Sequence, residues 1–566
     1  MGFHRCGDAC LADDSPMSCG ASCTPCTAPV GAIATCAMAM CDFTCSAGYD
    51  RVGATCELRV PRPIWPMSTS TVTTLRPTLR WQLAMGVEGA TVELCRDRAL
   101  TMSCTTEHVV GDRLVIATDL APGAWFWRLK PRSAGTTGAR SSATWQFHVP
   151  QRSATTATNW GTIPDFNGDG LADIAVGAPL ANSARGAVYV FNGGSTIAIT
   201  PSQTVSNPVA DTSWFGAQLA PAGDVDGDGF GDALVAMQPG ATSVGRVLLL
   251  RGSLAGLVAS SWQVLEDNRG DGIGSVMRGV GDLDGDGYGD VAVSTAVQRS
   301  LARVFVFRGG PSGLEASPAV RLSGVESAGW FGSSIATGDI NGDQLADFAI
   351  GEPSSLMGDG RGRVHVVLGR AGSIASMPSQ TVEAPDGGGF GTRVSTLGDA
   401  NGDGRSDWVI AAPYAGNGRV YVYAGAAVLG APLTSFANIA AGDPFSGWGV
   451  GNIVGDGRGA LLTTNTNGSG SARLYLADGA TVLPTAATSL AGLSGSGAEW
   501  GRLVASVGDL NGDGRDDVVI AASRVMAERG AVIVYAGGLS GLVTTPLATL
   551  TGSADGVRFG YSIASR

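Results

Sequence analysis

The 566-residue sequence predicts an all-β protein whose larger, C-terminal part is a seven-bladed β-propeller. A nine-residue acidic pattern, D-x-[DN]-G-D-x-x-x-D, recurs six times, and a seventh, degenerate copy lies between the fifth and the sixth. Successive copies begin 53 to 60 residues apart, and a fixed period of this size indicates a radially repeated architecture. Each period also contains four short apolar runs between glycine or polar turns, as expected for the strands of one blade.

The two ends of the repeat array predict that the C-terminus closes the ring. Most repeats begin with an aromatic-glycine strand directly before the acidic loop, for example from Trp330 to Thr337. The first repeat has only Trp160 to Pro164 in this place, whereas the last residues, Arg558 to Ala564, form a strand of the missing kind. We therefore expect the C-terminal strand to complete the first blade and to remove the exposed edges of an open array.

The acidic pattern has the ligand arrangement of a calcium-binding loop. Positions 1, 3 and 5 carry short side chains with oxygen atoms, and position 9 adds a carboxylate that can bind with both oxygens. Position 7 varies in chemistry, so its backbone carbonyl has to be the ligand there. Hard oxygen ligands of this kind suit Ca²⁺, and the sequence predicts up to six Ca²⁺ ions. The predicted ligands are Asp165, Asn167, Asp169, Leu171 and Asp173; Asp224, Asp226, Asp228, Phe230 and Asp232; Asp282, Asp284, Asp286, Tyr288 and Asp290; Asp339, Asn341, Asp343, Leu345 and Asp347; Asp399, Asn401, Asp403, Arg405 and Asp407; and Asp509, Asn511, Asp513, Arg515 and Asp517.

Glycine explains how the loop can curl tightly around an ion. Position 4 is glycine in all six copies and position 6 in five of them, which allows a positive φ without steric cost. The exception is Gln344. A left-handed conformation there costs about 1–2 kcal/mol, so we expect the fourth loop to bind metal more weakly.

Two other structures share parts of this pattern. An EF-hand needs a glutamate at position 12 and flanking helices, whereas position 12 is valine or isoleucine in every intact copy, which is typical of a buried strand. Plain Asp/Asn/Gly turns do not require carboxylates at positions 1, 5 and 9 together. In the degenerate copy, Asn452, Val454, Asp456 and Ala460 occupy positions 1, 3, 5 and 9, so we expect no metal there.

The repeats resemble FG-GAP repeats of the integrin α-subunit N-terminal β-propeller. The likeness covers residues 159 to 566. It implies a seven-bladed propeller that holds Ca²⁺ in loops between the first and second strands of its blades, on the face opposite the ligand surface. The residues that carry it are the pairs Phe215-Gly216, Phe331-Gly332 and Phe390-Gly391 and the later segments Gly177 to Pro179, Gly351 to Pro353 and Ala411 to Pro413.

Residues 1–58 are predicted to form a small disulfide-rich module. Nine of the eleven cysteines lie there, and dense cysteine in a segment with little apolar content indicates disulfides. A zinc site is the alternative, because Cys23 and Cys26 form a C-x₂-C pair. The stretch from Cys41 to Cys56 loosely resembles secreted EGF-like modules. Since nine is odd, one thiol is free or lacks its partner.

The region between this module and the propeller is predicted to contain a linker and a sandwich. Residues 59–71 include three prolines and are expected to be a stiff linker. Residues 72–150 contain short strands at the spacing of a β-sandwich. Leu120 to Phe126 resembles the strand corner of fibronectin type III domains, with Phe126 in place of the usual tyrosine. Cys95 and Cys104 are expected to link a hairpin.

Composition limits the partners and the location. The formal charge of −12 argues against nucleic-acid binding, and six Ca²⁺ ions would offset it. The N-terminus lacks the apolar segment of a secretion signal, and no run approaches the roughly 20 apolar residues of a membrane span. Together with the disulfides and the calcium loops, this predicts a monomeric protein of the cell exterior or cell surface.

The expected function is non-catalytic adhesion or protein interaction, with a protein or polysaccharide ligand on the face opposite the calcium loops. One alternative is a lectin-like propeller, in which Trp214 and Trp330 contact sugar instead of packing between blades. Another is an accessory role beside a surface hydrolase or lyase. We expect no enzymatic activity, because no G-x-S-x-G motif is present and the four histidines lie in separate regions. His365, in an apolar strand, is expected to be a core residue.

Overall fold

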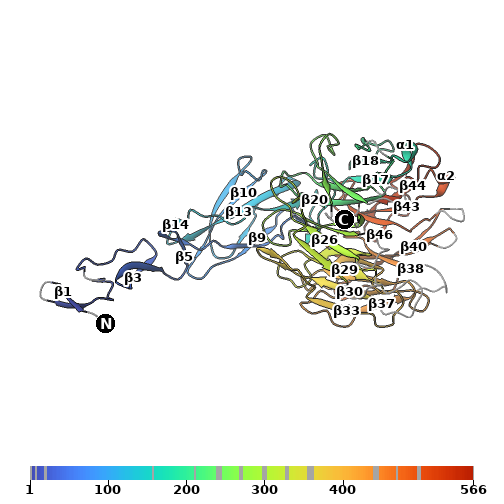
Figure 1. Cartoon of the computed structure of the whole chain (residues 1–566). Coiled ribbons are helices and arrows are strands. Elements are labelled where there is room, and N and C mark those ends of the chain that lie inside the picture. Colours follow the sequence, from blue (N-terminus) through green and yellow to red (C-terminus); the bar gives the residue numbers. More distant parts are fainter. Residues whose placement is uncertain are drawn as a thin grey trace. The chain divides into compact units, whose positions relative to one another are not determined.

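The structure is a computed structural model of the whole chain. It describes residues 3–6, 9–17, 19, 22–155, 159–209, 212–237, 245–266, 272–295, 302–324, 330–353, 362–437, 445–466, 469–493 and 499–564. The regular structure is almost entirely strand, which confirms the all-β prediction (Figure 1). Two single turns, α1 (Ala181–Ala184) and α2 (Val525–Glu528), are the helical elements of the described residues.

The chain divides into two compact units. The smaller one comprises Met1–Trp65, Thr78–Val115 and Phe126–Thr144, and the larger one comprises Pro66–Pro77, Ile116–Trp125 and Trp145–Arg566. The larger unit therefore contains the whole repeat array together with three segments that precede it.

Seven four-stranded antiparallel sheets make up the repeat array within the described residues. Consecutive strands pair with each other, as predicted for the blades of a propeller. The sheets in spatial order are β19 (Gln203–Ser206), β18 (Ala187–Phe191), β17 (Ile174–Ala178) and β48 (Ser562–Ile563); β20 (Gln218–Gly223), β21 (Asp232–Met237), β22 (Arg246–Leu250) and β23 (Trp262–Leu265); β24 (Ile273–Gly281), β25 (Asp290–Thr295), β26 (Arg303–Phe307) and β27 (Val320–Ser323); β28 (Ile335–Gly338), β29 (Asp347–Glu352), β30 (Arg363–Val367) and β33 (Gln380–Glu383); β34 (Arg393–Gly398), β35 (Asp407–Ala412), β36 (Arg419–Tyr423) and β37 (Thr434–Ala437); β38 (Phe445–Gly449), β39 (Ala460–Asn465), β40 (Ser471–Leu476) and β41 (Thr488–Ala491); and β42 (Val504–Gly508), β43 (Asp517–Ala522), β44 (Ala531–Tyr535) and β47 (Ala548–Thr551).

The first sheet takes its innermost strand from the C-terminus. Val176 of β17 pairs with Ile563 of β48, and the Ala564 amide donates to the Ala175 carbonyl at 3.0 Å. The prediction that the final strand completes the first blade is therefore confirmed.

Buried apolar side chains fill the space between consecutive sheets. The cluster between the first and last sheets includes Val176, Phe191, Val519, Val534 and Phe559, all of them at most 3% exposed. Burial of apolar surface is the main favourable term of folding, so each sheet depends on both of its neighbours.

Three further strands of the larger unit, β8 (Ser70–Val72), β15 (Trp145–Val149) and β16 (Asn159–Trp160), precede the first acidic loop. β15 pairs in parallel with β8, and β16 pairs with the other edge of β8. The hairpins β31–β32 (Gly369–Arg370 and Ser373–Ile374) and β45–β46 (Gly537–Gly538 and Gly541–Leu542) complete the strands of this unit.

The smaller unit consists of hairpins, a three-stranded sheet, and four strands of a seven-stranded sheet, of which β13 has its first residues, Gly123–Trp125, in the larger unit. The pairs are β1–β2 (Phe3–Cys6 and Ala9–Ala12), β3–β4 (Ala32–Ala37 and Met40–Cys45) and β5–β6 (Tyr49–Val52 and Thr55–Leu58); the sheets hold β12 (Arg113–Val115), β9 (Thr78–Gln82) and β7 (Arg62–Trp65), and β11 (Thr105–Val110), β10 (Gly89–Cys95), β13 (Gly123–Ser133) and β14 (Thr136–Thr137).

The segment expected to be a linker, residues 59–71, instead contributes β7 and β8. β7 pairs with β9 through Arg62↔Gln82 and Pro63↔Trp81. It lies at the edge of its sheet, where a proline without an amide hydrogen removes no ladder bond. The predicted domain boundaries at residues 58, 71 and 150 do not coincide with the division into compact units.

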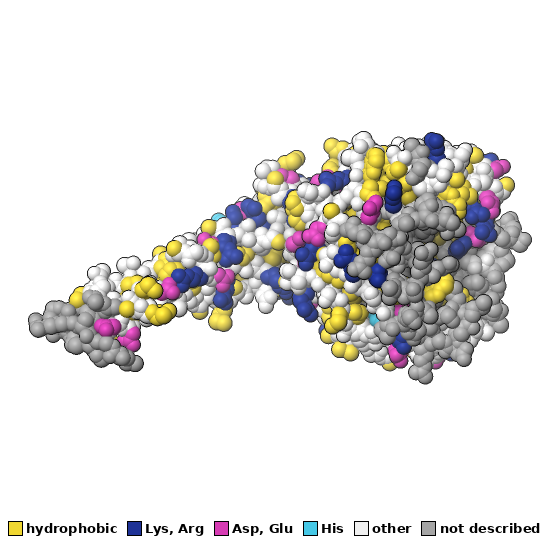
Figure 2. Space-filling view, viewed as in Figure 1, with side chains coloured by type: hydrophobic (Ala, Val, Ile, Leu, Met, Phe, Trp, Pro, Cys, Tyr) yellow, Lys and Arg dark blue, Asp and Glu magenta, His cyan; other side chains and the backbone are white. Residues whose placement is uncertain are grey.

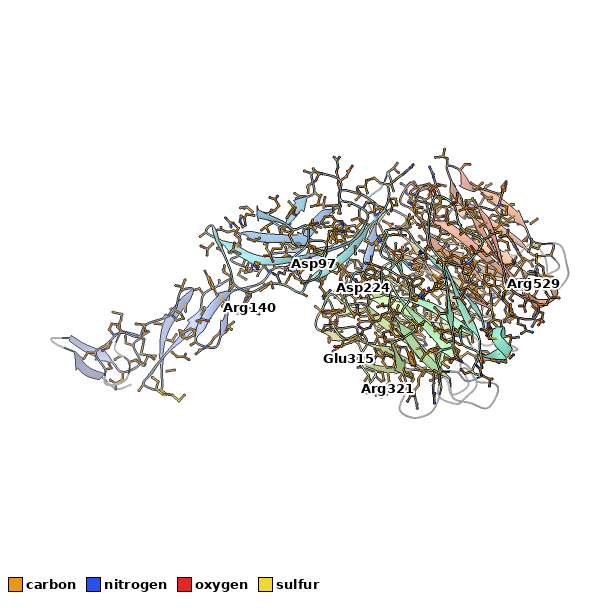
Figure 3. All side chains as sticks on the ribbon, turned by 90° about the horizontal axis from the view of Figure 1, so that it is seen from above. Asp97, Arg140, Asp224, Glu315, Arg321 and Arg529 are labelled. Atoms are coloured by element: carbon orange, nitrogen blue, oxygen red, sulfur yellow. A yellow bond between two sulfur atoms is a disulfide. The ribbon has the colours of Figure 1, made fainter. Side chains whose placement is uncertain are left out.

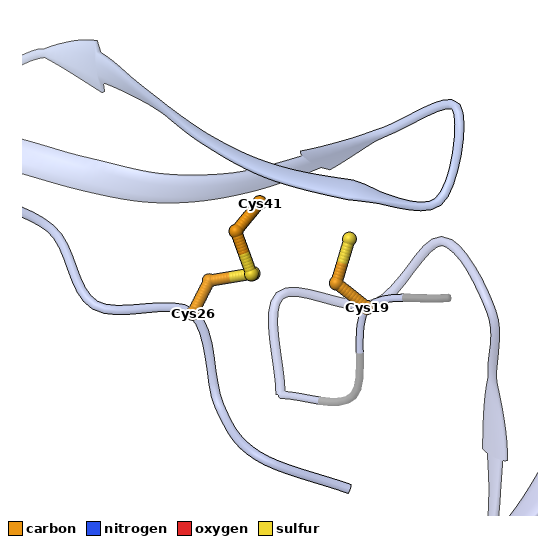
Figure 4. A group of neighbouring side chains, drawn as sticks. All are labelled: Cys19, Cys26 and Cys41. Atoms are coloured by element: carbon orange, nitrogen blue, oxygen red, sulfur yellow. A yellow bond between two sulfur atoms is a disulfide. The ribbon is translucent and has the colours of Figure 1, made fainter. Parts of the chain in front are cut away.

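Disulfides link the cysteine-rich segment, as predicted. The bonds are Cys19–Cys36, Cys26–Cys41 and Cys45–Cys56, and Cys95–Cys104 links the expected hairpin. Cys19, Cys26 and Cys41 lie close together (Figure 4), but their sulfurs are consumed in disulfides and so do not supply the thiolates of a zinc site. The side chains of Cys6 and Cys10 lie outside the described residues.

Candidate metal centres

Five of the six acidic loops follow the innermost strands of their blades, the first lies between β16 and β17, and all six share one backbone conformation. In the second loop, Asp224 Oδ1 accepts the amides of Gly227 and Asp228 at 2.7 and 3.1 Å, and Oδ2 accepts that of Gly229 at 2.7 Å. The chain thus winds around the first aspartate. Equivalent bonds form in the other five loops at Asp165, Asp282, Asp339, Asp399 and Asp509.

The glycines take the predicted conformation. Position 4 has φ between 72° and 80° in all six loops, and the five glycines at position 6 have φ between 83° and 96°. Gln344 has a φ of 68°. The left-handed conformation expected of this residue is therefore confirmed, and the fourth loop carries its steric cost.

The aspartate at position 9 ties each loop to the sheet behind it. In the second loop, Asp232 Oδ2 accepts the Val225 amide at 3.0 Å and Oδ1 accepts the Gly252 amide at 2.9 Å. Each carboxylate oxygen has two lone pairs, so both oxygens retain one for a cation. The residue is fully buried in all six loops, at Asp173, Asp232, Asp290, Asp347, Asp407 and Asp517.

The second and third loops bring three carboxylates together. Oxygens of Asp224, Asp226 and Asp232 lie within 4.8 Å of one another, and so do those of Asp282, Asp284 and Asp290. These are positions 1, 3 and 9. In the other four loops position 3 is asparagine, which supplies a neutral oxygen instead.

Position 5 lies outside these groups of three. The side chains at this position are exposed in five loops, and Asp228 Oδ1 accepts the Phe230 amide at 3.0 Å. Asp286 Oδ1 accepts the Tyr288 amide at the same distance. In the second and third loops, the structure thus brings together three of the four predicted side-chain ligands, and the fourth, at position 5, is exposed.

Burial and mutual repulsion raise the pKa values of these carboxyls. Burial, followed by repulsion from Asp228, raises the pKa of Asp224 to about 7, and the pKa of Asp282 rises to about 7 in the same way, with Asp286 as its neighbour. Burial also raises the pKa of Asp339 to about 6. Burial and the adjacent Asp282 raise the pKa of Asp290 well above its usual range. A divalent cation would compensate this charge in place of protons.

Asp284 provides the clearest sign that the donors suit a cation. Its Oδ1 is buried and has no hydrogen-bond partner, while its Oδ2 lies 3.1 Å from Arg308 Nε. A buried carboxylate oxygen without a partner is costly. Asp284 therefore contributes a carboxylate with an unpartnered oxygen to the group formed with Asp282 and Asp290, and this all-oxygen set suits Ca²⁺.

Two arginines at these loops were not predicted from the sequence. Arg251 Nη1 lies 2.8 Å from Asp226 Oδ2, and Arg308 plays the equivalent part at Asp284. Each arginine directly precedes the glycine whose amide binds the position-9 aspartate. At the equivalent place, the four loops with asparagine at position 3 have Asn192, Leu368, Ala424 and Ala536. The arginine thus occurs only where position 3 is a carboxylate, and this pairing was readable in the sequence.

The segment before the repeats also reaches the acidic loops. His148 Nε2 in β15 lies 3.1 Å from Asp165 Oδ2, and Trp145 Nε1 donates to the Gly285 carbonyl at 3.1 Å. The sequence places His148 seventeen residues before the first loop, so nothing local links them. Only the pairing of β15 with β8 inside the larger unit brings the imidazole to the site.

The degenerate loop has the backbone of the others but fewer carboxylates. Asn452 Oδ1 accepts the Gly457 amide at 2.9 Å, and Asp456 Oδ2 lies 3.4 Å from Arg458 Nη1. Ala460 occupies position 9. This loop thus has a single carboxylate, which is paired with an arginine, and the absence of metal from it stays a prediction.

The remaining residues singled out in the sequence fall in two groups. Trp214 and Trp330 are both half-buried, so their exposure favours neither sugar contact nor simple packing. His365 is 1% exposed, and its Nε2 and Nδ1 lie 2.6 and 2.9 Å from Glu352 Oε2 and Thr381 Oγ1. It is a satisfied core residue, as predicted.

Comparison with known families identifies the repeats. Residues 159–191, 331–367, 390–423 and 501–535 match the model of the FG-GAP repeat, so the chain contains FG-GAP repeats within its propeller fold. Parts of the chain are similar to integrin α-subunits. The chain is 36% identical over 161 residues to integrin alpha-V of Gallus gallus and 32% identical over 229 residues to integrin alpha-IIb of Homo sapiens.

These likenesses cover only parts of the proteins compared. The matches span 26% and 37% of this chain and 15% and 20% of the two integrins, so the chain spans a fifth or less of these relatives. A putative 6-phosphogluconolactonase from Bacteroides uniformis aligns over 67% of this chain and 99% of its own, with a TM-score of 0.43 and 13% identity. A likeness at that level carries no argument about activity. Among the described residues, no helix has the length and apolarity needed to cross a membrane.

Proposed function

We propose that this protein is an extracellular, calcium-binding propeller of the integrin-α type that acts as a non-catalytic adhesion or interaction module. The observation that carries the calcium part is the group of Asp282, Asp284 and Asp290, with its unpartnered buried oxygen. Oxygen donors without nitrogen or sulfur favour a hard cation, and the mixture of carboxylates and carbonyls suits the flexible coordination of Ca²⁺ better than the strict octahedron of Mg²⁺.

The metal has a structural role in this proposal. The amide of Gly231 in the second loop donates to the carbonyl of Asp165 in the first, and Ala172 of the first loop donates to Asp509 of the last. Gly289, Ala346 and Ser406 make the same link to the loops that precede theirs. An ion that fixes one loop therefore also fixes an acceptor for the next loop, and calcium stabilises the ring as a whole.

The ligand class that we propose is argued from the propeller face opposite the acidic loops and from the charge of the protein. The loop face is occupied in part by β8 and β15, which leaves the ends of the innermost strands opposite the loops for a ligand. On the face drawn in Figure 2, acidic and basic side chains of the described residues are interspersed, and the net charge is −12. Neither feature favours nucleic acid. We infer a protein or polysaccharide ligand.

An extracellular location and the lack of catalysis complete the proposal. Disulfides persist in oxidising surroundings, and loops of this kind bind calcium at extracellular concentrations. The carboxylates of the acidic loops are committed to the backbone and to a cation, which leaves them poorly placed for general acid–base chemistry.

Isothermal titration of the full chain with Ca²⁺ tests the metal part. Asp284→Asn removes a charged ligand from the third loop, whereas Asp456→Asn changes an aspartate of the degenerate loop. We expect the wild-type chain to bind several ions, Asp284→Asn to bind one fewer or to bind more weakly, and Asp456→Asn to match the wild type. Absence of calcium binding by the folded protein would refute the proposal.

A further inference from the structure

A cavity of about 310 Å³ lies at the axis of the repeat array, where the innermost strands begin. All seven sheets line it, through residues of or adjacent to β20, β24, β28, β34, β38, β42 and β48. The acidic loops follow the opposite, C-terminal ends of such strands. The cavity, called the axial cavity below, therefore opens away from the candidate metal centres.

The charge of the axial cavity is opposite to that of the protein. Its charged lining residues are Arg278, Arg393, Arg502 and Glu499, which leaves an excess of two positive charges in a chain with a net charge of −12. Glu499 Oε1 lies 2.8 Å from Nη1 of Arg502 and 3.4 Å from Nε of Arg524, which is outside the lining. The one carboxylate of the lining is thus paired with Arg502 and Arg524.

Arg393 is held in place without a carboxylate. Its guanidinium carbon lies 3.6 Å from the centroid of the Trp448 ring, and its Nε donates to Ser446 Oγ at 3.1 Å. Among the described residues, none forms an ion pair with it, and its two terminal nitrogens have no protein acceptor. A guanidinium fixed by stacking presents a preorganised pair of donors that matches an oxyanion.

Two neighbouring arginines, Arg278 and Arg502, add to the positive charge around Arg393, which favours binding of an anion. Burial lowers the pKa of Arg278 and that of Arg393 to about 10, and Arg278 and Arg502 further lower the pKa of Arg393 through repulsion. Both groups remain charged at neutral pH. Like charges gathered in a partly desolvated space are unfavourable unless a counter-charge joins them.

The rest of the lining is rich in neutral hydrogen-bonding groups. Gln218, Ser275, Ser333, Ser523 and Tyr561 all contribute to it. Ser333 Oγ donates to the Gly351 carbonyl and Ser523 Oγ donates to Glu499 Oε2, so these two hydroxyls can still accept. The hydroxyls of a sugar ring can donate to them and also pair with Gln218, Ser275 and Tyr561, whereas a simple acidic side chain has too few groups to do so. The volume is at the lower end of the range for ligand pockets, which suits a group of about monosaccharide size.

We propose that the axial cavity binds an acidic sugar unit of a polysaccharide, with Arg393 and Arg278 holding its carboxylate or sulfate group. This inference rests on the proposed function, because it names the ligand class for the face opposite the metal loops. The stacked guanidinium of Arg393 pairs with the anionic group, and the hydroxyls of the lining bind the ring.

Titration calorimetry of the full chain in excess Ca²⁺ tests the inference with four probes: glucuronate, glucose 6-sulfate, glucose and glutamate. We expect glucuronate or glucose 6-sulfate to bind, and the comparison of the two shows whether the site prefers a carboxylate or a sulfate. Glucose and glutamate should bind far more weakly. Arg393→Gln should weaken binding of the acidic sugar about ten- to hundredfold, as expected for loss of hydrogen bonds to a charged group.

The matched control is Arg321→Gln. Arg321, labelled in Figure 3, lies on β27, the outermost strand of its sheet. It also stacks on an aromatic ring, with its guanidinium carbon 5.9 Å from the Phe305 centroid. This variant should bind the acidic sugar like the wild type. If Arg393→Gln does not fold, Arg278→Gln provides the same test at the second guanidinium.

Equal binding of glucose and glucuronate, tighter binding of glutamate, no binding of either acidic sugar, or unchanged binding in folded Arg393→Gln and Arg278→Gln would each overturn the proposal. Calcium titrations of the same samples separate failure of the sugar-binding proposal from failure of the metal part of the proposed function. Loss of sugar binding with calcium binding intact refutes only the axial site. Sugar binding without calcium binding refutes only the metal proposal.

Discussion

Ile563, in the last strand of the chain, pairs with Val176 in the first sheet of the repeat array. Phe559, just before that strand, packs on Tyr189 with ring centroids 5.6 Å apart and is 1% exposed. The two ends of the array therefore share one sheet and one apolar cluster.

Truncation after Asp555 is expected to prevent stable folding, because it removes β48 and the buried Phe559 and Ile563 together. The single change Phe559→Ala should cost about 3–5 kcal/mol of unfolding free energy, the usual range for a buried phenylalanine. Leu539→Ala is the control, since Leu539 is 85% exposed. Chemical denaturation monitored by tryptophan fluorescence measures both. A Phe559→Ala variant as stable as Leu539→Ala would contradict the closed ring.

Removal of calcium should lower the melting temperature. A site whose dissociation constant is a hundredfold below the calcium concentration stabilises the fold by about 2.7 kcal/mol, and several sites add to this. Calorimetric melts in Ca²⁺ and in EDTA measure the difference, with Mg²⁺ as the control cation. An unchanged melt in EDTA would show that the loops are folded without metal.

Gln344→Gly should stabilise the protein and tighten calcium binding at the fourth loop. The substitution removes the cost of a left-handed non-glycine residue, about 1–2 kcal/mol. The reciprocal change, Gly404→Gln, places the same side chain at position 6 of the fifth loop, where φ is 83° and no atom lies within 4 Å of the added Cβ. It should destabilise by a similar amount. Shifts of the same sign in the two variants would disprove the explanation.

Arg251→Gln should raise the calcium affinity of the second loop several-fold, because it removes the cation that lies 2.8 Å from Asp226. The same change should destabilise the calcium-free protein, since the three carboxylates of Asp224, Asp226 and Asp232 then lie together without compensation. Arg246→Gln, at an exposed arginine on β22, is the control. Titration and melting of both variants measure the two effects, and a weaker calcium affinity in Arg251→Gln would contradict the proposed competition.

The pH dependence of stability should reverse when calcium is added. In the calcium-free protein, the pKa values of Asp224 and Asp282 are raised to about 7 from an ordinary value near 4. The folded state then binds more protons than the unfolded chain, so this contribution is full below about pH 4 and is lost as the pH rises through about 7. With calcium, deprotonated carboxylates are the ligands, and stabilisation by the metal should grow over the same range. Melts between pH 5 and 8 in EDTA and in Ca²⁺ test this, and parallel curves would contradict it.

The sequence predicted those features that depend on local pattern. The loop backbone follows from glycine at positions 4 and 6, and even the strained Gln344 was foreseen, because the φ of a residue is set by its immediate neighbours. The closing strand was also predictable, since Phe559 and Gly560 repeat a motif seen in other blades.

The features that were missed depend on contacts between distant segments. His148 reaches Asp165 only because β15 pairs with β8, and Arg393 meets Arg278 only because the innermost strands surround one axis. The sequence predicts a linker where the structure has β7, because its prolines suit an edge strand and a linker equally well. The spacing of residues along the chain does not predict contacts between such distant segments.

The shared first sheet has a consequence for synthesis on the ribosome. β17 is made nearly four hundred residues before β48, so a nascent chain carries an unpaired strand edge until β48 emerges. Unpaired edges promote association between chains. Emergence of β48 is thus the step at which the first sheet is protected from pairing with another chain.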